Sequence, residues 1–277
     1  MHEDSLEKTD EANLALDYQH SFEVLAKAVA GFASVVEQLL TAAVKSTEQW
    51  SGTINSLAEI DWQKVSQRLE DLPAHSKECM RTALSKGWFF GWHDDLQTVY
   101  TLIDTLLSVP AEQVDEVMIA FYRPRIGEYT DRLVGHHPTR SAPILAARNA
   151  HLMMSEEGYL LSIPVFIAQA DGMLAQTFGM ENALKKIGKI VKQRFADDPE
   201  KLDLLQPLLE LESSKFMMSS GKRPEDFEGL NRHQVLHGEV SDYGTEVNSL
   251  KAFSFLVFVG LHLPVTAPDL AKPSTPF

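Results

Sequence analysis

The sequence predicts an all-α protein built as a helical bundle. Apolar residues recur every three or four positions along nearly the whole chain, which is the spacing that buries one face of a helix. A hydrophobic content of 44%, with 15 glycines and 13 prolines, is typical of an ordered globular protein. A chain of 277 residues is also long enough to bury a sizeable core.

The first half of the chain is expected to form helices separated by short breaks. Apolar spacing predicts the first helix, and Ser51-Gly52 ends it. Pro73 is expected to begin a helix, and Pro110 opens another whose first turns are acidic, as the helix dipole favours. The helices expected here cover residues 14–48, 54 or 60 to 72, 73–84, 93–109 and 110–122.

An aromatic cluster, Trp88-Phe89-Phe90-Gly91-Trp92, precedes the helix expected at 93–109. If exposed, it would form a platform on which bases stack or a partner docks. If buried, it would be an aromatic plug between helices. We favour the plug, because aromatic side chains most often lie in a core.

The second half of the chain shows a sharper helical pattern. The helices expected here cover residues 139–157, 159–178, 182–195, 199–219 and 247–263. Gly158 is expected to end the first of them. The chain is expected to turn at residues 135–138, and the His136-His137 pair there has no carboxylate or cysteine at ligand spacing. We therefore interpret that pair as part of a polar loop.

The charge of the chain divides it into two functional parts. The net charge is -14, and residues 1–121 carry 8 Lys and Arg against 20 Asp and Glu. Such an acidic chain should not bind nucleic acid indiscriminately, although its C-terminal half is free to carry a local basic surface. We expect an acidic helical region at 1–121 for docking, sensing or dimerisation, a helical domain at 139–263, and a loosely ordered tail at 264–277.

The composition predicts a cytoplasmic protein without a metal or other cofactor. Cys79 is the single cysteine, which excludes an intramolecular disulfide and a cysteine-rich zinc site. The polar, acidic N-terminus has no secretory signal. The longest apolar run, residues 252–263, is too short to span a bilayer, so no membrane partner is expected.

The stretch Leu230–Tyr243, LNRHQVLHGEVSDY, carries the candidate chemistry. Arg232 offers a planar fork of donors to an anionic oxygen, and His237 can hold or release a proton near neutral pH. A spacing of five puts two helical side chains about 140° apart, so both reach one phosphate only if the helix begins at Arg232. The chemistry indicated is work on a phosphodiester.

Other polar residues could support such a site. Asp171 lies in an apolar stretch where a bare carboxylate would be costly, so we expect it to be paired or hydrogen-bonded. Lys185, Lys189 and Lys192 fall on one face of the helix expected at 182–195. They are candidates for RNA binding, and a solvated helix face is the alternative interpretation.

The second half of the chain resembles the HEPN superfamily over about residues 139–263. An alanine-rich helix ends in Gly158-Tyr159, and the next carries Gln169-Ala170-Asp171, as in the central hairpin of those domains. Arg232 and His237, with polar His233 between them, are similar to the R-polar-X3-H motif. A closer likeness is to uncharacterised bacterial proteins with an NRHxVLHG…DYGT…NSLK segment.

The resemblance implies a helical bundle that pairs as a homodimer and cleaves RNA without metal. It also implies a role as a toxin or phage-defence effector, with an antitoxin or other defence-system partner. Arg232 would hold the scissile phosphate, and His237 would assist 2′-hydroxyl attack or protonate the leaving oxygen. Asn231 and His233 would orient the phosphate, and Asp171, next to Gln169, would fix Arg232 or His237. The insertion at 239–246 departs from the family pattern.

Two alternatives stay open beside the ribonuclease. The first is a non-catalytic HEPN-like module that binds a nucleotide or a protein, in which Arg232 and His237 are structural. The second is a membrane-surface or partner-helix protein that uses the run at 252–263, although a bundle core explains that run equally well. An apolar final helix that needs cover is a further argument for a homodimer.

Overall fold

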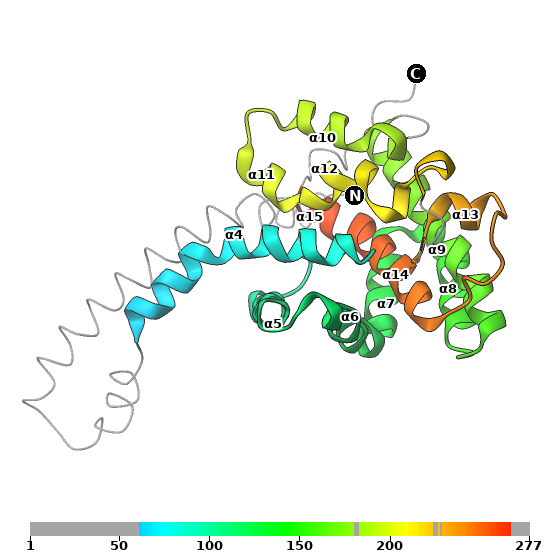
Figure 1. Ribbon diagram of the computed structural model, residues 1–277, viewed down its shortest axis with the longest axis horizontal. Coiled ribbons are helices and arrows are strands. Elements are labelled where there is room, and N and C mark those ends of the chain that lie inside the picture. The colour runs from blue at the N-terminus through cyan, green and yellow to red at the C-terminus, as the bar shows by residue number, and fades with distance from the viewer. Residues whose placement is uncertain (1–60, 180–182, 224–226, 228, 267–277) are drawn as a thin grey trace, which may run out of the picture. The chain divides into compact units, whose positions relative to one another are not determined.

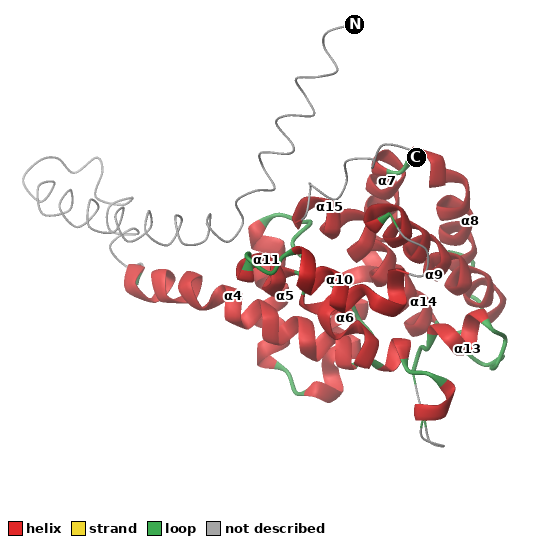
Figure 2. Ribbon diagram, turned by 90° about the horizontal axis from the view of Figure 1, so that it is seen from above, coloured by secondary structure: helices red, strands yellow, loops and turns green. Residues whose placement is uncertain are grey.

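The computed structural model covers the chain and describes residues 61–179, 183–223, 227 and 229–266. In this part of the chain, helices and loops are present and no strand is found (Figure 2), which confirms the predicted all-α class. The chain divides into two compact units, one of Asp17–His75 and one that includes Ser76–Phe277. Helix α4, Trp62–Ser85, begins in the first unit, and the other described helices belong to the second. The helix expected at 14–48 lies outside the described residues.

The helices of the described part differ in length, and short 3-10 turns connect several of them. Their bounds are α4 Trp62–Ser85, α5 Leu96–Ser108, α6 Val114–Tyr122, α7 Ile126–His136, α8 Ser141–His151, α9 Glu156–Phe178, α10 Ile187–Arg194, α11 Pro199–Leu204, α12 Gln206–Glu210, α13 Arg232–Leu236, α14 Glu246–Val257 and α15 Leu263–Thr266. In Figure 1, α14 and α15 run through the middle of the fold, with α10 and α12 above and α5 and α6 below.

The centre of the fold is α14, because its sequence is apolar almost all round. Every residue from Ser249 to Val257 is buried. The central segment of the fold is α14 together with the turn Phe258–His262 that continues it. Helix α9 packs along α14 and also along α8, while α6 contacts α14 and α7 contacts the turn. The apolar helix is therefore covered within one chain, and it no longer argues for a homodimer; that prediction now depends on the family resemblance.

The aromatic cluster at 88–92 is the buried plug that we favoured. Trp88, Phe89, Phe90 and Trp92 are at most 1% exposed. The ring of Phe89 contacts Phe255 and Phe258 of the central segment, with ring centroids 4.7 and 6.1 Å away. A platform for stacking bases is thus excluded, and residues 88–92 share one core with the C-terminal helices.

A π-helical turn, Phe258–His262, continues α14 and gives the core two unusual hydrogen bonds. The Nδ1 atom of His262 accepts from the backbone N–H of Trp92 at 2.8 Å, and Nε2 lies 2.9 Å from the carbonyl of Leu204. Burial lowers the pKa of His262 to about 3, so the ring stays neutral. Gly91 allows this approach, because a Cβ there would lie 2.3 Å from the imidazole.

Three expected helix boundaries were wrong. Pro73 lies inside α4 and does not begin a helix. Gly158 lies in the first turn of α9, where its missing Cβ lets the chain pass the carbonyl of Ala150 in α8. The helix expected at 199–219 is broken into α11, α12 and two 3-10 turns. Pro207 cannot donate a backbone hydrogen bond, which accounts for the break between α11 and α12, and the extended backbone of Ser214 separates the two 3-10 turns.

One helix in the described part, α9, is long and apolar enough to cross a membrane by length and composition. This is weak support for a membrane protein, because core helices of soluble proteins pass the same test. In this fold 44% of its apolar window is buried, and the helix packs against α8 and α14. Its place in the core accounts for its hydropathy.

Candidate functional site

Helix α13 carries the candidate motif, and Asn231 holds it in place. The Oδ1 atom of Asn231 accepts from the backbone N–H groups of His233 and Gln234 at 3.0 and 3.1 Å, which caps the helix. Its Nδ2 group donates to the carbonyls of Lys215 and Met218 at 2.7 and 2.9 Å. Because both amide atoms are occupied and the residue is 1% exposed, Asn231 positions the motif and does not face solvent.

Arg232 and Asp171 form an ion pair that joins α13 to α9. The Nη2 atom of Arg232 donates to Oδ2 of Asp171 at 3.2 Å, and the two side chains are 12% and 28% exposed. The Nε atom of Arg232 is buried and has no hydrogen-bond partner among the residues that the structure describes. Asp171 thus lies where it can fix Arg232, and the Nε donor of the guanidinium is closed off from solvent.

The two histidines of the motif lie one helical turn apart and stack. The rings of His233 and His237 have centroids 5.7 Å apart and planes 13° from parallel. His237 is exposed and ends α13, whereas His233 is half-buried. Burial, followed by the nearby charges of Arg232 and His237, lowers the pKa of His233, and Glu239 opposes this. The lowered pKa favours the neutral form of the His233 imidazole.

The side chains of Arg232 and His237 face different surroundings. Arg232 begins α13 and is directed into the contact with α9, while His237 follows the last residue of the same short helix and is exposed. A spacing of five along a helix accounts for this separation. The structure brings Arg232 to Asp171, and His233 to His237.

Gln169 lies on α9 but is engaged elsewhere. Its Oε1 atom accepts from Nη1 of Arg140 at 3.1 Å. Arg140 can lie across α9 because Gly172 has no side chain there; a Cβ would be 2.8 Å from the guanidinium. Gln169 therefore ties the start of α8 to α9, and the structure gives it no contact with the motif.

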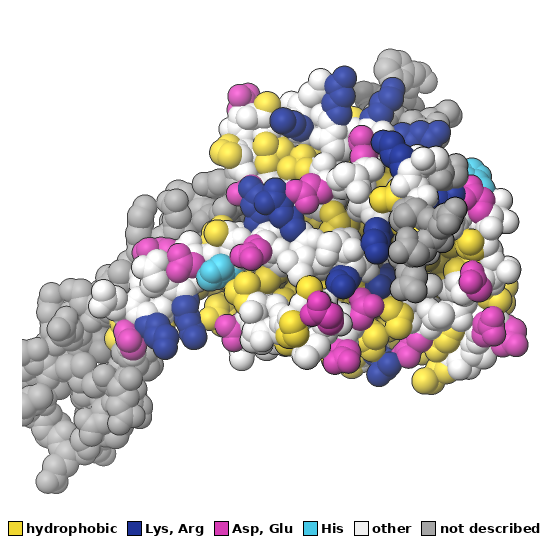
Figure 3. Space-filling model, in the orientation of Figure 1, with side chains coloured by type: hydrophobic (Ala, Val, Ile, Leu, Met, Phe, Trp, Pro, Cys, Tyr) yellow, Lys and Arg dark blue, Asp and Glu magenta, His cyan; other side chains and the backbone are white. Residues whose placement is uncertain are grey.

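The three lysines proposed for RNA binding are exposed but lie in two elements. Lys185 belongs to a 3-10 turn, Ala183–Lys186, whereas Lys189 and Lys192 lie on α10. In Figure 3, lysine and arginine side chains gather over the region of α10 and the segments beside it. Of the three lysines, Lys185 lines a pocket next to α13, and the other two do not.

That pocket has a volume of about 500 Å³ and was not foreseen from the sequence. Its wall is assembled from distant segments, so no local pattern could have indicated it. The residues that line it are Lys185, Glu212, Ser213, Met217, Met218, Ser219, Lys222 and His233.

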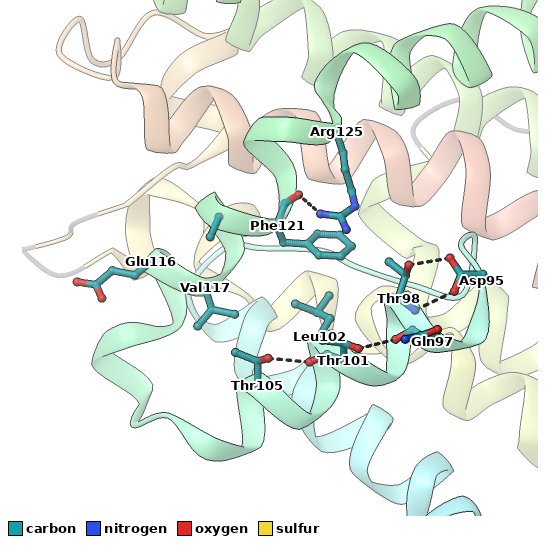
Figure 4. A pocket seen from close by; sticks show the side chains of 11 residues that line it. Asp95, Gln97, Thr98, Thr101, Leu102, Thr105, Glu116, Val117, Phe121 and Arg125 are labelled. Atoms are coloured by element: carbon teal, nitrogen blue, oxygen red, sulfur yellow. Dashed lines mark hydrogen bonds between the residues drawn. The ribbon is translucent and has the colours of Figure 1, made fainter. Parts of the chain in front are cut away.

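A second hollow of about 740 Å³ lies between α5 and α6 (Figure 4) and contains no residue of the motif. Several of its polar groups are already satisfied within the fold. Thr101 and Thr105 donate to carbonyls of their own helix, and the Nη1 atom of Arg125 donates to the carbonyl of Phe121.

No group of three or more His, Cys, Asp or Glu residues that could hold a metal ion occurs within 61–179, 183–223, 227 and 229–266. No protein-family model, no curated protein and no solved structure matches the chain.

Proposed function

We propose that this protein is a metal-independent endoribonuclease of the HEPN type that acts as a toxin or phage-defence effector. The observation that carries the proposal is the pairing of Arg232 with Asp171 next to the stacked imidazoles of His233 and His237. Such an arrangement places a cation and two proton carriers on one short helix, which is what cleavage of a phosphodiester requires.

In the proposed reaction the ribose 2′-oxygen attacks the adjacent phosphorus and its proton passes to an imidazole. The bond from phosphorus to the 5′-oxygen breaks, and that oxygen takes up a proton. The products end in a 2′,3′-cyclic phosphate and a 5′-hydroxyl. His237 would exchange a proton with the RNA, while Arg232 would stabilise the charge that develops on the phosphate.

The test is incubation of the protein with total RNA and labelled tRNA in EDTA. We expect cleavage to persist in EDTA, and His237→Ala to reduce it by roughly 100-fold or more. Arg232→Lys should also lose most activity, because a point ammonium cannot replace a planar fork. His136→Ala removes an exposed histidine at the end of α7 and is the matched control.

Two results would contradict this mechanism: cleavage that chelation abolishes, and cleavage that His237→Ala leaves unchanged. An RNA with a deoxyribose at the cut site should resist, since the attacking hydroxyl is missing. The melting temperature of His237→Ala should stay within a few degrees of the wild type, because the side chain is exposed.

The second candidate is a non-catalytic module that binds a nucleotide or protein, with a structural role for Arg232. The burial of the Arg232 side chain, 12% exposed, and its ion pair with Asp171 favour this alternative. It predicts binding of a nucleotide or a protein without cleavage of RNA.

A homodimer and an antitoxin or other defence-system partner also remain proposals. An apolar surface available to a partner is the turn between α8 and α9, where Leu152, Met153 and Met154 are 51%, 59% and 71% exposed. Cytoplasmic localisation likewise remains a proposal.

A further inference from the structure

The pocket beside α13 has a polar rim and an apolar floor. Lys185 and Lys222 are exposed at its rim, and the exposed hydroxyl of Ser219 lines it with them. Ser213 also lines the pocket, but its hydroxyl donates to the carbonyl of Glu210 at 2.9 Å. Glu212 is the acidic residue of the lining. The pocket thus offers two cations and one hydroxyl to an anion, within a chain whose net charge is -14.

The floor of the pocket is made by two methionines. Met217 is 7% exposed and Met218 is half-buried. Thioether side chains are polarisable and pack well against aromatic rings. The side-chain amide of Asn231 donates to the carbonyl of Met218, so the cap of α13 also fixes this wall.

The pocket adjoins the proposed cleavage site directly. His233 lines it from α13, and its ring stacks on that of His237. The sulfur of Met217 lies 3.9 Å from Nη1 of Arg232, so the floor of the pocket separates it from the guanidinium. Only the side chain of Met217 would therefore separate a ligand in the pocket from Arg232, and only that of His233 would separate it from His237.

We propose that this pocket seats one nucleotide of single-stranded RNA, with the base against Met217 and Met218 and the phosphate at the rim. A volume of about 500 Å³ lies within the range of small-ligand sites. Single strands are commonly held by a basic groove with bases stacked on aromatic rings; here the polarisable sulfurs of Met217 and Met218 would contact the base in place of a Phe, Tyr or Trp. The proposal deepens the ribonuclease function and rests on it, since the seated nucleotide would flank the cut.

The three lysines expected to bind RNA provide an internal comparison. Lys185 lines the pocket, whereas Lys189 on α10 is exposed and does not. If RNA follows the lysine-bearing face of the helix, both residues should contribute equally. If a nucleotide sits in the pocket, Lys185 and Lys222 should contribute and Lys189 should not.

The experiment measures fluorescence anisotropy of a dye-labelled eight-nucleotide RNA with the full chain in the His237→Ala background, so that binding is separated from cleavage. Lys185→Met and Lys222→Met should each weaken binding about 5- to 10-fold at low salt, and Lys189→Met less than 2-fold. All three variants remove the same charge from an exposed position, and equal melting temperatures would verify that each folds.

The salt dependence gives an independent readout. Each lost phosphate contact should lower the slope of log affinity against log salt concentration by about 0.7 for a single strand. Adenosine monophosphate should displace the RNA at lower concentration than inorganic phosphate, because only the nucleotide can occupy the methionine floor.

Equal loss of binding in Lys189→Met and Lys222→Met would overturn the pocket proposal, as would displacement by phosphate that matches displacement by adenosine monophosphate. Absence of RNA binding at millimolar concentration would overturn it too. If the pocket variants weaken binding but the wild-type protein cleaves no RNA, the ribonuclease proposal fails while the nucleotide pocket stands.

Discussion

The core beneath the π-helical turn and the surface around α13 both depend on histidines, but in opposite ways. In the core, the two ring nitrogens of His262 are each occupied by a backbone group, and the ring is fully buried. At α13, His237 is exposed, and the neighbouring Arg232 has a buried Nε atom without a hydrogen-bond partner in the described part of the chain.

This difference separates structural polar groups from candidates for ligand binding. A buried polar group that is fully hydrogen-bonded has no capacity left for a ligand, and losing it costs stability. An exposed group such as His237 costs less to alter and can contact a substrate. We therefore expect changes in the core to affect folding, and changes at α13 to affect activity.

The largest effect should follow from Gly91→Ala in the core. The added Cβ would lie 2.3 Å from the ring of His262, which its two backbone hydrogen bonds hold in place. We expect a loss of about 3 kcal/mol in the free energy of unfolding, measured by urea denaturation. Gly127→Ala is the control, because this glycine of α7 has nothing within 4 Å of its missing Cβ.

Gly127→Ala should stabilise the fold by about 0.5–1 kcal/mol, since alanine favours a helix more than glycine. A loss below about 1 kcal/mol in Gly91→Ala would show that the imidazole of His262 can move aside. The core around His262 would then be less rigid than its contrast with the surface at α13 requires.

A smaller effect per residue should appear when the pH is lowered. Burial lowers the pKa of His93 to about 4 and that of His262 to about 3, from an ordinary value of 6.5. At pH values between the folded-state pKa and 6.5, the unfolded chain binds more protons than the folded chain. The free energy of unfolding must therefore fall as the pH falls from 7 to 5. The loss should be about 2 kcal/mol per histidine.

His93→Phe tests this dependence, because neither ring nitrogen of His93 has a hydrogen-bond partner among the described residues. The variant should lose less stability between pH 7 and pH 5 than the wild type, by about 2 kcal/mol. Melting curves at several pH values measure the slope, and His136→Ala should leave it nearly unchanged. An identical slope in His93→Phe would mean that the pKa of this ring is the same in the folded and the unfolded chain.

The smallest effect should come from the ion pair at α13. A double-mutant cycle of Arg232→Met and Asp171→Leu should give a coupling energy of about 1 kcal/mol, because the carboxylate is partly hydrated. The more exposed pair Arg123 and Glu246 offers a reference cycle, where we expect about 0.5 kcal/mol. Coupling above about 3 kcal/mol would favour the structural role of Arg232 over the catalytic one.

Much of the fold could be predicted from the sequence because helical periodicity is a local signal. The all-α class and the burial of Trp88 and Phe89 were expected and are confirmed. The boundary at Gly158 was wrong, since the same residue that ends a helix can also let two helices cross closely. Sequence alone does not distinguish these uses.

The candidate site was predictable only in part. The need of Asp171 for a partner followed from its apolar surroundings, and the structure supplies Arg232 as that partner. The pocket could not be foreseen, because Lys222 and Ser213 reach it from segments that have no shared pattern. Likewise, no local feature shows that Gln169 engages Arg140.

The π-helical turn at 258–262 has a consequence for how the chain can change in length. This turn places the carbonyl of Gly260 2.9 Å from Nε2 of His137, while His262 reaches Trp92. Deleting one residue here would rotate everything that follows by about 100° along the helix axis. Both partners would be lost together, so the segment should accept substitutions more readily than insertions or deletions.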